Sequence, residues 1–428
     1  MIVIAGGGAA GFFAAIAAAE SNPRAGVMLL EKTARPLAKV GISGGGRCNV
    51  THDCFDPRAL ATRYPRGGRA LIGPLTRFGP AETVAWFESR GVRLKTESDG
   101  RMFPVTDSSQ TIIACLERAA QKAGVHVSIG TGLRSARQRE QGGFTLELTN
   151  GTILDCERLL WAGGGCKPEA HPAVALGHTL VPPVPSLFTF HIDEPWVRAL
   201  SGLSVSDVEV AVPGEKLKER GPVLFTHAGL SGPAILRLSA WGARVLHARN
   251  YRFPLLLNWL PGTTPQAILT EIQDRRVSQG AKTLLRSVWH PLPARLWERL
   301  LEQAEIPPGT RWSAFPSHQA RALARVLTAT PLAACGKSMN KEEFVTCGGI
   351  PLTEVDFKTM QSRIVPGLYF AGEALDIDGV TGGFNFQAAW TTGWIAGRAV
   401  AASLTAGDID SPAQARAGLE RAGRLPCG

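Results

Sequence analysis

The chain has 428 residues, of which 44% are hydrophobic and 19% charged, as in a soluble globular protein of two or three domains. After the N-terminal segment, no later apolar run approaches the roughly 20 residues that a membrane helix needs. The eight cysteines form no C-x-x-C pair, which indicates reduced thiols in a cytoplasmic protein and neither a disulfide framework nor a metal site. The net charge of +10 admits a nucleic-acid partner, but there is no run of five like charges, so we interpret most of it as a solvated basic surface.

The first thirty residues predict a dinucleotide-binding turn. An apolar run at 1–5 leads into Gly6-x-Gly8-x-x-Gly11, an Ala-rich segment and a second apolar run that ends in Glu31. Such glycines permit a sharp turn, an approach to a pyrophosphate and close helix packing, and the acid can bind ribose hydroxyls. The expected contacts here are Gly6, Gly8, Ala9, Ala10, Gly11, Glu31 and Lys32. The alternatives are an Ala-rich packing helix after a Gly-rich turn, or a signal peptide, for which the basic leader and the cleavage site are missing.

A second glycine cluster follows at residues 36–51. Three adjacent glycines favour a loop that lies flat against a planar ligand, with its N–H groups at the ligand's polar edge. Lys39 and Arg47 would add positive charge beside the pyrophosphate or the ring. The expected contacts are Lys39, Gly41, Ser43, Gly44, Gly45, Gly46, Arg47, Cys48 and Asn49. The alternative is a flexible surface loop.

Residues 55–125 are expected to be largely helical, with a short strand at 100–104. A strand at 125–129 and a hairpin around Asn150-Gly151 should follow. An apolar strand at 158–165 ends in small residues and should return the chain to a parallel sheet beside the cofactor. The expected cofactor contacts in this part are Leu133, Ala162, Gly163 and Gly164.

From about residue 187 to 340 the pattern predicts an inserted domain with a β part and a smaller helical part. Strands are expected at 188–192, 208–212 and 253–258, and helices at 292–303, 317–327 and after Thr264-Pro265. Ser231 is expected to cap a helix whose first turn holds Pro233. His227 lies in a Gly-rich loop and is a candidate catalytic proton carrier, although a histidine bonded to backbone is the alternative.

The chain then returns to a nucleotide-binding pattern. Strands at 345–350 and 367–373 precede a Gly-Gly loop and a helix from about 386 to 402. Glu373 could bind ribityl hydroxyls, and the helix end at 383–387 could face the N1–C2=O edge of a flavin. The expected contacts are Gly372, Glu373, Asp378, Gly382, Gly383, Phe384 and Asn385.

Four segments, 6–11, 44–49, 226–234 and 372–385, together resemble the BaiN/YhiN-like bacterial flavoproteins, also labelled NAD(P)/FAD-dependent or aminoacetone-oxidase-like oxidoreductases. The resemblance implies an α/β fold: a Rossmann-like, glutathione-reductase-type FAD-binding domain interrupted by a β-barrel-like insert with a small helical subdomain. With the proline-rich boundary at 182–185, the expected domain ranges are 1–186, 187–340 (helical at about 263–310) and 341–428. The resemblance also implies FAD bound extended and non-covalently, with its ring near 44–49 and 382–385. Phe384 stands where the family pattern has Tyr.

The chain has one Gly-x-Gly-x-x-Gly in a strand–turn–helix context. NAD(P)H would therefore be a transient electron donor that uses the same flavin face as the substrate; the alternative is a separate electron carrier. Cys48 and Cys54 miss the spacing of flavin disulfide reductases by one residue, which leaves Cys48 as a candidate catalytic thiol near the ring. We expect an FAD-dependent oxidoreductase for a small organic substrate; the resemblance suggests a steroid for one branch. The alternative is an FAD-containing RNA-modifying or nucleic-acid-binding protein, which predicts basic residues clustered on one face of the insert and salt-sensitive RNA binding.

Overall fold

The computed structural model describes residues 1–165, 171–338 and 345–404. The chain divides into two compact units: unit 1 is Met1–Val184 with Lys341–Gly428, and unit 2 is Pro185–Asn340. The predicted domain ranges, as domains that would fold independently, stay a prediction. Two of the eight cysteines, at 166 and 427, lie outside the described residues.

Unit 1 is built on a seven-stranded sheet with the order β19-β20-β21-β10-β1-β2-β6. The five strands from β21 to β6 run parallel, whereas β19 and β20 form an antiparallel edge. The buried, uninterrupted apolar strands β1 and β2 are typical of a parallel sheet covered on both faces. The strands are β1 (Ile2–Ala5), β2 (Val27–Leu30), β6 (His126–Ser128), β10 (Arg158–Trp161), β19 (Val355–Asp356), β20 (Gln361–Ser362) and β21 (Leu368–Phe370).

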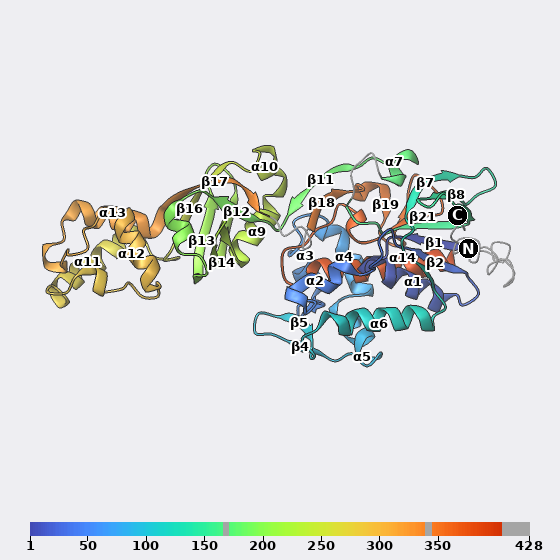
Figure 1. Ribbon diagram of the computed structural model, residues 1–428, viewed down its shortest axis with the longest axis horizontal. Coiled ribbons are helices and arrows are strands. Elements are labelled where there is room, and N and C mark those ends of the chain that lie inside the picture. The colour runs from blue at the N-terminus through green and yellow to red at the C-terminus, as the bar shows by residue number, and fades with distance from the viewer. Residues whose placement is uncertain (166–170, 339–344, 405–428) are drawn as a thin grey trace. The chain divides into compact units, whose positions relative to one another are not determined.

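Helices α1 (Ala9–Ser21) and α14 (Phe384–Ala402) pack against each other although they come from opposite ends of the chain (Figure 1). Glycines make this contact close. A Cβ at Gly393 would lie 2.6 Å from the Ala10 carbonyl oxygen, and one at Gly397 would lie 2.2 Å from the Ala14 carbonyl oxygen. The two helices therefore approach backbone to backbone, and the Ala-rich segment is a buried helix.

The remaining elements of unit 1 confirm the largely helical stretch and the hairpin around Asn150-Gly151. Its helices are α2 (Ala38–Gly46), α3 (Pro57–Ala61), α4 (Gly68–Arg77), α5 (Pro80–Glu88), α6 (Ser109–Lys122) and α7 (Pro172–Ala175). Two small sheets have the orders β3-β5-β4 and β7-β8-β9, and β11 pairs with β18. These strands are β3 (Thr51–His52), β4 (Leu94–Thr96), β5 (Arg101–Pro104), β7 (Leu133–Gln138), β8 (Phe144–Leu148), β9 (Ile153–Cys156), β11 (Val181–Ser186) and β18 (Val345–Gly349).

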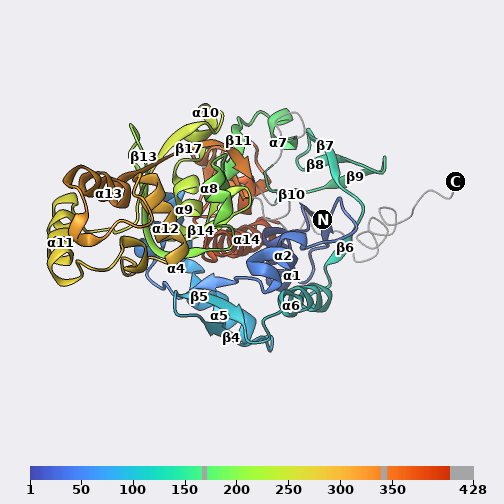
Figure 2. The same ribbon diagram turned by 60° about the vertical axis from the view of Figure 1, so that its left-hand side comes forward.

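Unit 2 contains a closed barrel with the strand order β12-β15-β14-β13-β16-β17. This barrel confirms the β-barrel-like insert that the family resemblance implied. Helices α11, α12 and α13 form its helical part (Figure 2). The barrel strands are β12 (Thr189–Ile192), β13 (Ser204–Val212), β14 (Leu217–Thr226), β15 (Gly229–Ser231), β16 (Phe253–Asn258) and β17 (Thr330–Ser338). The helices of the unit are α8 (Pro195–Ala199), α9 (Pro233–Trp241), α10 (Ala243–Ala248), α11 (Pro265–Ser278), α12 (Ala294–Gln303) and α13 (Ser317–Ala329).

Two details of unit 2 differ from the sequence-based expectation. The cap of α9 is Gly232, at φ 94°, and not Ser231, whose hydroxyl lies 2.9 Å from that of Thr189 within the barrel. The helical part also continues beyond residue 310, because α13 supplies Leu323 and Leu327 to the core that it shares with α11 and α12. Among the described residues, no helix combines the length and apolar character needed to cross a bilayer.

Candidate functional site

The turn between β1 and α1 combines two tightly enclosed glycines with one open glycine. A Cβ at Gly6, where φ is 118°, would lie 2.4 Å from the Ala162 carbonyl oxygen, and one at Gly11 would lie 1.8 Å from the Gly6 carbonyl oxygen. A Cβ at Gly8 would meet no protein atom within 4 Å. Helix α1 has no side-chain cap, so the N–H groups of its first turn have neither a cap nor an intrahelical acceptor. The turn thus offers anion-binding donors beside open space.

Glu31 is held at the carboxyl end of β2. Its carboxylate accepts hydrogen bonds from the backbone N–H of Gly7 (2.9 Å) and Thr33 (2.8 Å) and from the Thr33 hydroxyl (2.7 Å). A Cβ at Gly132 would lie 2.9 Å from the Cβ of Lys32, so Leu133, the next residue, starts β7 close to this strand end. These contacts bring Glu31, Lys32 and Leu133 together, as a binding site for an adenosine would require.

The C-terminal segment of unit 1 joins the site through Gly372 and Glu373. A Cβ at Gly372 would lie 2.7 Å from the Cβ of Ala10 in the first turn of α1. Glu373 Oε2 lies 2.6 Å from Lys39 Nζ and 4.0 Å from the position that a Cβ of Gly164 would take. Residues expected from four separate stretches of sequence therefore converge on one place.

The second glycine cluster has an irregular backbone that only partly matches the expected loop. Helix α2 extends into it, but Ser43 is extended and Gly44 and Gly45 are left-handed, with φ of 59° and 69°. The Gly41 carbonyl oxygen accepts a hydrogen bond from Ser109 Oγ (2.7 Å). A Cβ at Gly45 or Gly46 would meet nothing within 4 Å, so the open side of this turn can receive a ligand.

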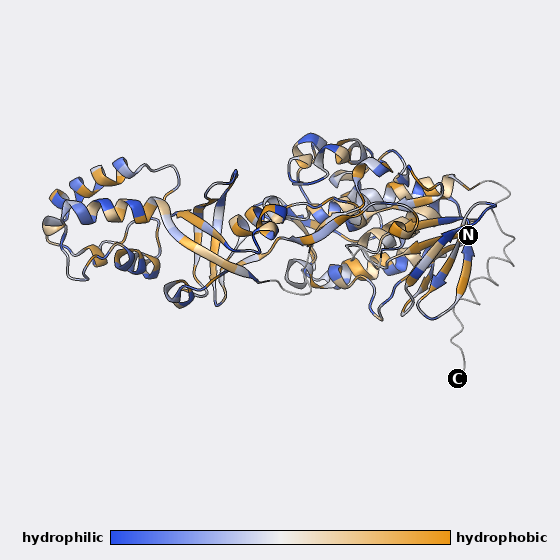
Figure 3. Cartoon of the chain, turned by 90° about the horizontal axis from the view of Figure 1, so that it is seen from above, coloured by the Kyte–Doolittle hydropathy of each residue, from blue (hydrophilic) through white to orange (hydrophobic). Residues whose placement is uncertain are grey.

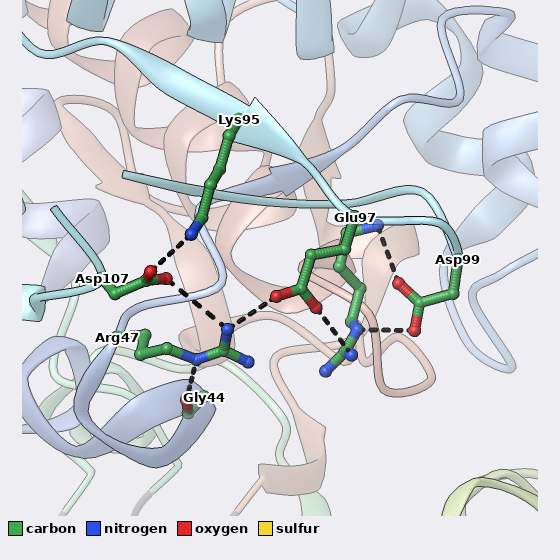
Figure 4. A network of polar contacts seen from close by, with 7 residues as sticks. Gly44, Arg47, Lys95, Glu97, Asp99 and Asp107 are labelled. Carbon is green, nitrogen blue, oxygen red and sulfur yellow. Dashed lines mark hydrogen bonds and ion pairs between the residues drawn. The ribbon is translucent and has the colours of Figure 1, made fainter. Parts of the chain in front are cut away.

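Arg47 lies in a charged network and not at a free anion site. Its guanidinium is 2.6 Å from Glu97 Oε1 and 3.6 Å from Asp107 Oδ1 (Figure 4). It also lies over the Phe103 ring, 4.0 Å from the ring centroid. Lys95 and Arg101 complete the network by pairing with Asp107 and Glu97, respectively. Two carboxylates therefore neutralise much of the positive charge that the sequence offered to a cofactor here.

Cys48 is fully buried, with a left-handed φ of 62°. Burial raises the pKa of its thiol to about 12, so the thiol is protonated near neutral pH. A reactive thiolate needs an exposed and positive setting, and Arg47 does not provide one. The structure therefore gives no support to Cys48 as a nucleophile, and it shows Cys54 as a free cysteine.

The N-terminus of α14 faces the end of the second glycine cluster. In the orientation that satisfies both ends of its amide, Asn49 accepts a hydrogen bond from the Gly383 N–H (3.0 Å). Asn385 bonds both the N–H (2.8 Å) and the carbonyl oxygen (2.9 Å) of Gly379. The buried Asp378 is ion-paired with Arg66. Asn385 and Asp378 thus hold the loop before α14, whose first-turn N–H groups have no side-chain cap.

Sequence reasoning missed His52, which no local motif marks. Its ring stacks on Phe384, with centroids 4.8 Å apart and planes at 23°. Burial lowers the pKa of His52 and so favours the neutral imidazole. Close by, Thr51 and Thr83 donate hydrogen bonds to Gln387 Oε1 at 2.6 and 3.0 Å. These buried contacts fix β3 on the first turns of α14.

The buried His178 has triad-like neighbours but a structural role. His178 Nδ1 lies 2.7 Å from Glu354 Oε2, and Nε2 lies 2.8 Å from Ser362 Oγ. However, Ser362 Oγ already accepts hydrogen bonds from the N–H groups of Ile364 and Val365. Burial alone would raise the pKa of Glu354, but bonds from Thr179 and His178 lower it. The group therefore ties β20 to the rest of unit 1.

His227 is exposed in the turn between β14 and β15. It belongs to unit 2, whereas every residue expected to bind the cofactor belongs to unit 1. Its candidate role in proton transfer stays a prediction.

Unit 1 fits an extended dinucleotide. Gly8, Gly45 and Gly46 leave open space where a Cβ would stand, and the N-termini of α1 and α14 lack side-chain caps. Glu31 and Glu373 supply acceptors for hydroxyl groups at the ends of β2 and β21. Their combination is typical of a site for a cofactor with a diphosphate and two polyol segments.

Comparisons with known proteins agree with a site for such a cofactor. The chain is 31% identical over 403 residues to a ribosomal RNA dihydrouridine synthase of Escherichia coli (strain K12), covering 92% of this chain and 96% of that protein. It is 30% identical to a 3-dehydro-bile acid delta(4,6)-reductase of Clostridium scindens, covering 94% and 98%. A solved 3-ketosteroid delta1-dehydrogenase from Sterolibacterium denitrificans shares the fold, with a TM-score of 0.51 at 13% identity, covering 94% and 99%.

Residues 1–399 match the family model described as HI0933-like protein Rossmann domain. This match confirms the resemblance to the BaiN/YhiN-type flavoproteins and the FAD-binding Rossmann-type fold. The chain belongs to the HI0933-like Rossmann domain family and is an FAD-dependent oxidoreductase.

Proposed function

We propose that the protein reduces a carbon–carbon double bond conjugated to a carbonyl group. Two relatives of different name support this reaction class. Dihydrouridine is uridine with the ring double bond beside a carbonyl reduced, and a delta(4,6)-reductase of a 3-dehydro bile acid acts on double bonds conjugated to the 3-oxo group. Both reactions add a hydride to one carbon and a proton to its neighbour, so one kind of site can serve both.

The structural observation that carries the proposal is the open site for FAD in unit 1. The turn at Gly6–Gly11 and the second glycine cluster form it together with the segment 372–385; we call this site the cradle. We assign the diphosphate of FAD to the N–H groups of Ala9 and Ala10, which face the open side of Gly8. Glu31 would hold the adenosine ribose, and Glu373 the ribityl chain. Asn49 and Gly383 would flank the ring. The full proposed set is the one expected from the sequence, with Arg47, Asp378 and Asn385 supporting the loops.

Bound FAD supplies the hydride in such a reaction. The chain's own contribution is electrostatic: the N-terminus of α14 carries the positive end of a 19-residue helix, which stabilises negative charge at the pyrimidine edge of the ring. Burial lowers the pKa of His52 and so favours its neutral form, and Cys48 is protonated near pH 7. We propose NAD(P)H as the transient electron donor; because the chain has one dinucleotide motif and FAD takes it, the donor would use the flavin face that the substrate then uses.

For the substrate, a small steroid-like ring enone is the first candidate, supported by the bile acid reductase relative. A uridine in ribosomal RNA is the second. It is favoured by the E. coli relative and by the charge of unit 2, which has eighteen Lys and Arg against eleven Asp and Glu. Both substrates present a six-membered ring with a conjugated carbonyl.

The test is an anaerobic stopped-flow experiment on FAD-loaded protein. NADPH or NADH should bleach the visible flavin band. A 4-ene-3-oxo steroid or a ribosomal RNA transcript should then restore the band, with a product that has gained two hydrogens by mass spectrometry. If only quinones or oxygen restored it, the proposed reaction class would be wrong.

A further inference from the structure

We propose that the helical part of unit 2 is a docking surface for the phosphate backbone of a folded RNA. The proposal rests on the RNA substrate candidate above and names the part of the chain that would hold that substrate. The main observation is that two stretches without acidic residues are hydrogen-bonded to each other. Both expose Lys or Arg side chains that have no acidic partner among the described residues. We call Lys282, Arg286, Arg311, Arg321 and Arg325 the basic surface.

The positive charge of the protein is concentrated in unit 2. Residues 185–340 carry a net charge of +7, out of +10 for the whole chain. The other residues of the chain have 28 Lys and Arg against 25 Asp and Glu, a net of +3. Most of the excess positive charge therefore lies in unit 2, although the sequence shows no basic run.

Within unit 2, two stretches hold no Asp or Glu. Residues 275–297 contain five Lys and Arg, and residues 306–338 contain four. Backbone hydrogen bonds join the two stretches: Leu284 N–H to the Thr310 carbonyl oxygen (3.0 Å) and Trp312 N–H to the Lys282 carbonyl oxygen (3.1 Å). A bridge between Thr283 and Arg311 sets the register. Lys282 and Arg311 are consequently close, and both are exposed.

Helix α13 adds a basic stripe. His318, Arg321 and Arg325 are spaced by three and four residues, which places them on one face of the helix. All three are exposed, whereas Leu323 and Leu327 are buried. The helix has no acidic residue. Figure 3 shows hydrophilic residues in blue on the helices of unit 2.

Two cations on the barrel strands, in contrast, are paired with acids. On the barrel, Lys218 pairs with Glu209 (2.8 Å) and Arg220 with Asp207 (2.7 Å). In the part of the chain that the structure describes, none of the five residues of the basic surface has an acidic partner within 4.0 Å. Unneutralised cations from three segments fit several phosphates, each of which releases counterions on binding.

The surface also indicates the kind of RNA. Its aromatic residues Trp289, Trp297 and Trp312 are buried, and the exposed large hydrophobic residues described between 259 and 329 are Val277 and Val288. Binding of single strands relies on exposed aromatic rings that stack on bases. Without them, contacts to the backbone of a folded RNA are favoured over base readout.

The test uses FAD-loaded full-length protein and a fluorescent, folded ribosomal RNA transcript, with binding measured by anisotropy at two salt concentrations. Arg321→Glu with Arg325→Glu, and separately Lys282→Glu with Arg311→Glu, should each weaken binding about tenfold or more and flatten its salt dependence. Lys216→Glu with Lys218→Glu on the barrel makes the same change in net charge and should keep most of the affinity. Melting temperature and flavin bleaching by the nicotinamide donor should stay at wild-type values in all three.

Equal losses in the barrel variant, tighter binding of poly(U) than of the folded transcript, or no RNA binding by wild-type protein would each overturn the docking surface. These outcomes are distinct from failure of the proposed reaction. A protein that reduces the steroid enone but ignores RNA retains its reaction class and loses this inference. Salt-sensitive binding through the basic surface without any reduction of a double bond would leave the inference standing and remove the proposed reaction.

Discussion

Gly8 and Gly11 share one turn, but their surroundings are opposite. A methyl group at Gly8 would meet no protein atom within 4 Å, whereas one at Gly11 would lie 1.8 Å from a carbonyl oxygen. We therefore expect Gly8→Ala to fold with an unchanged apo melting temperature and to lose about tenfold or more in FAD affinity, about 1.4 kcal/mol. Gly11→Ala should cost about 1–3 kcal/mol of folding free energy through overpacking. Thermal melts of the apo-proteins and FAD titrations measure both; equal FAD affinity of Gly8→Ala and wild type would contradict the assignment.

Cys48 makes stability sensitive to alkaline pH. The pKa of the thiol is raised by burial from 9.0 to about 12. Above pH 9 the unfolded chain loses the proton while the folded chain keeps it, so the free energy of unfolding should fall as the pH rises from 9 towards 12. A fully shifted group contributes a slope of about 1.4 kcal/mol per pH unit.

Urea unfolding at pH 8, 9 and 10 tests this expectation. Burial also raises the pKa of Cys115 and Cys156, so the wild-type slope is a sum. Comparison with Cys48→Ser isolates the contribution of Cys48 to this slope. The free energy of unfolding of that variant should fall less steeply above pH 9 than that of wild type. Parallel curves for the two proteins would mean that the Cys48 thiol is not buried as described.

The contact between α1 and α14 is an element-scale feature with a sharp test. Ala is a better helix former than Gly by about 1 kcal/mol, but a Cβ at Gly397 would lie 2.2 Å from the Ala14 carbonyl oxygen. The overlap should prevail, so Gly397→Ala should destabilise by about 1–3 kcal/mol. Ala402→Leu adds more volume at an exposed position of the same helix and should stay within about 0.5 kcal/mol of wild type. Chemical denaturation measures both; a stabilised Gly397→Ala would mean that the helices lie further apart.

Local patterns predicted elements well where one stretch of sequence contained the whole cause. Thr264 caps α11 through its side chain (3.1 Å to Ala267 N–H), as expected. Ser231 has a similar pattern, but it belongs to a barrel strand and its hydroxyl pairs with Thr189. The turn at Gly6–Gly11 was predictable because its cause is local.

The partners of the site residues were less predictable because they come from distant segments. Lys39 and Glu373 are 334 residues apart, and motifs located both without indicating that they pair. Arg47 meets Glu97 and Asp107 because the second glycine cluster packs on Phe103 of β5, beside the segments that carry these two acids. His52 had no signal, because its position depends on α14 packing against β3.

At the scale of the whole molecule, FAD should stabilise one unit selectively. At a free FAD concentration of 100 times the dissociation constant, binding adds about 2.7 kcal/mol to the free energy of unfolding of the part of the protein that binds FAD. Hydrogen exchange should therefore slow in β1, α1, β21 and the start of α14, and stay unchanged in α11, α12 and α13. Mass spectrometry of peptides with and without FAD provides the measurement. Protection spread evenly over both units would contradict a cradle confined to unit 1.

The pairing of α1 with α14 also has a consequence for biosynthesis. A ribosome releases the N-terminal helix first, and more than 360 residues separate its end from the start of the helix that covers it. During that interval the side of α1 that α14 covers stays an uncovered, alanine-rich apolar surface, a state prone to aggregation. Cofactor loading must then wait until translation is nearly over, so truncated chains ending before Phe384 should be colourless and depend on chaperones.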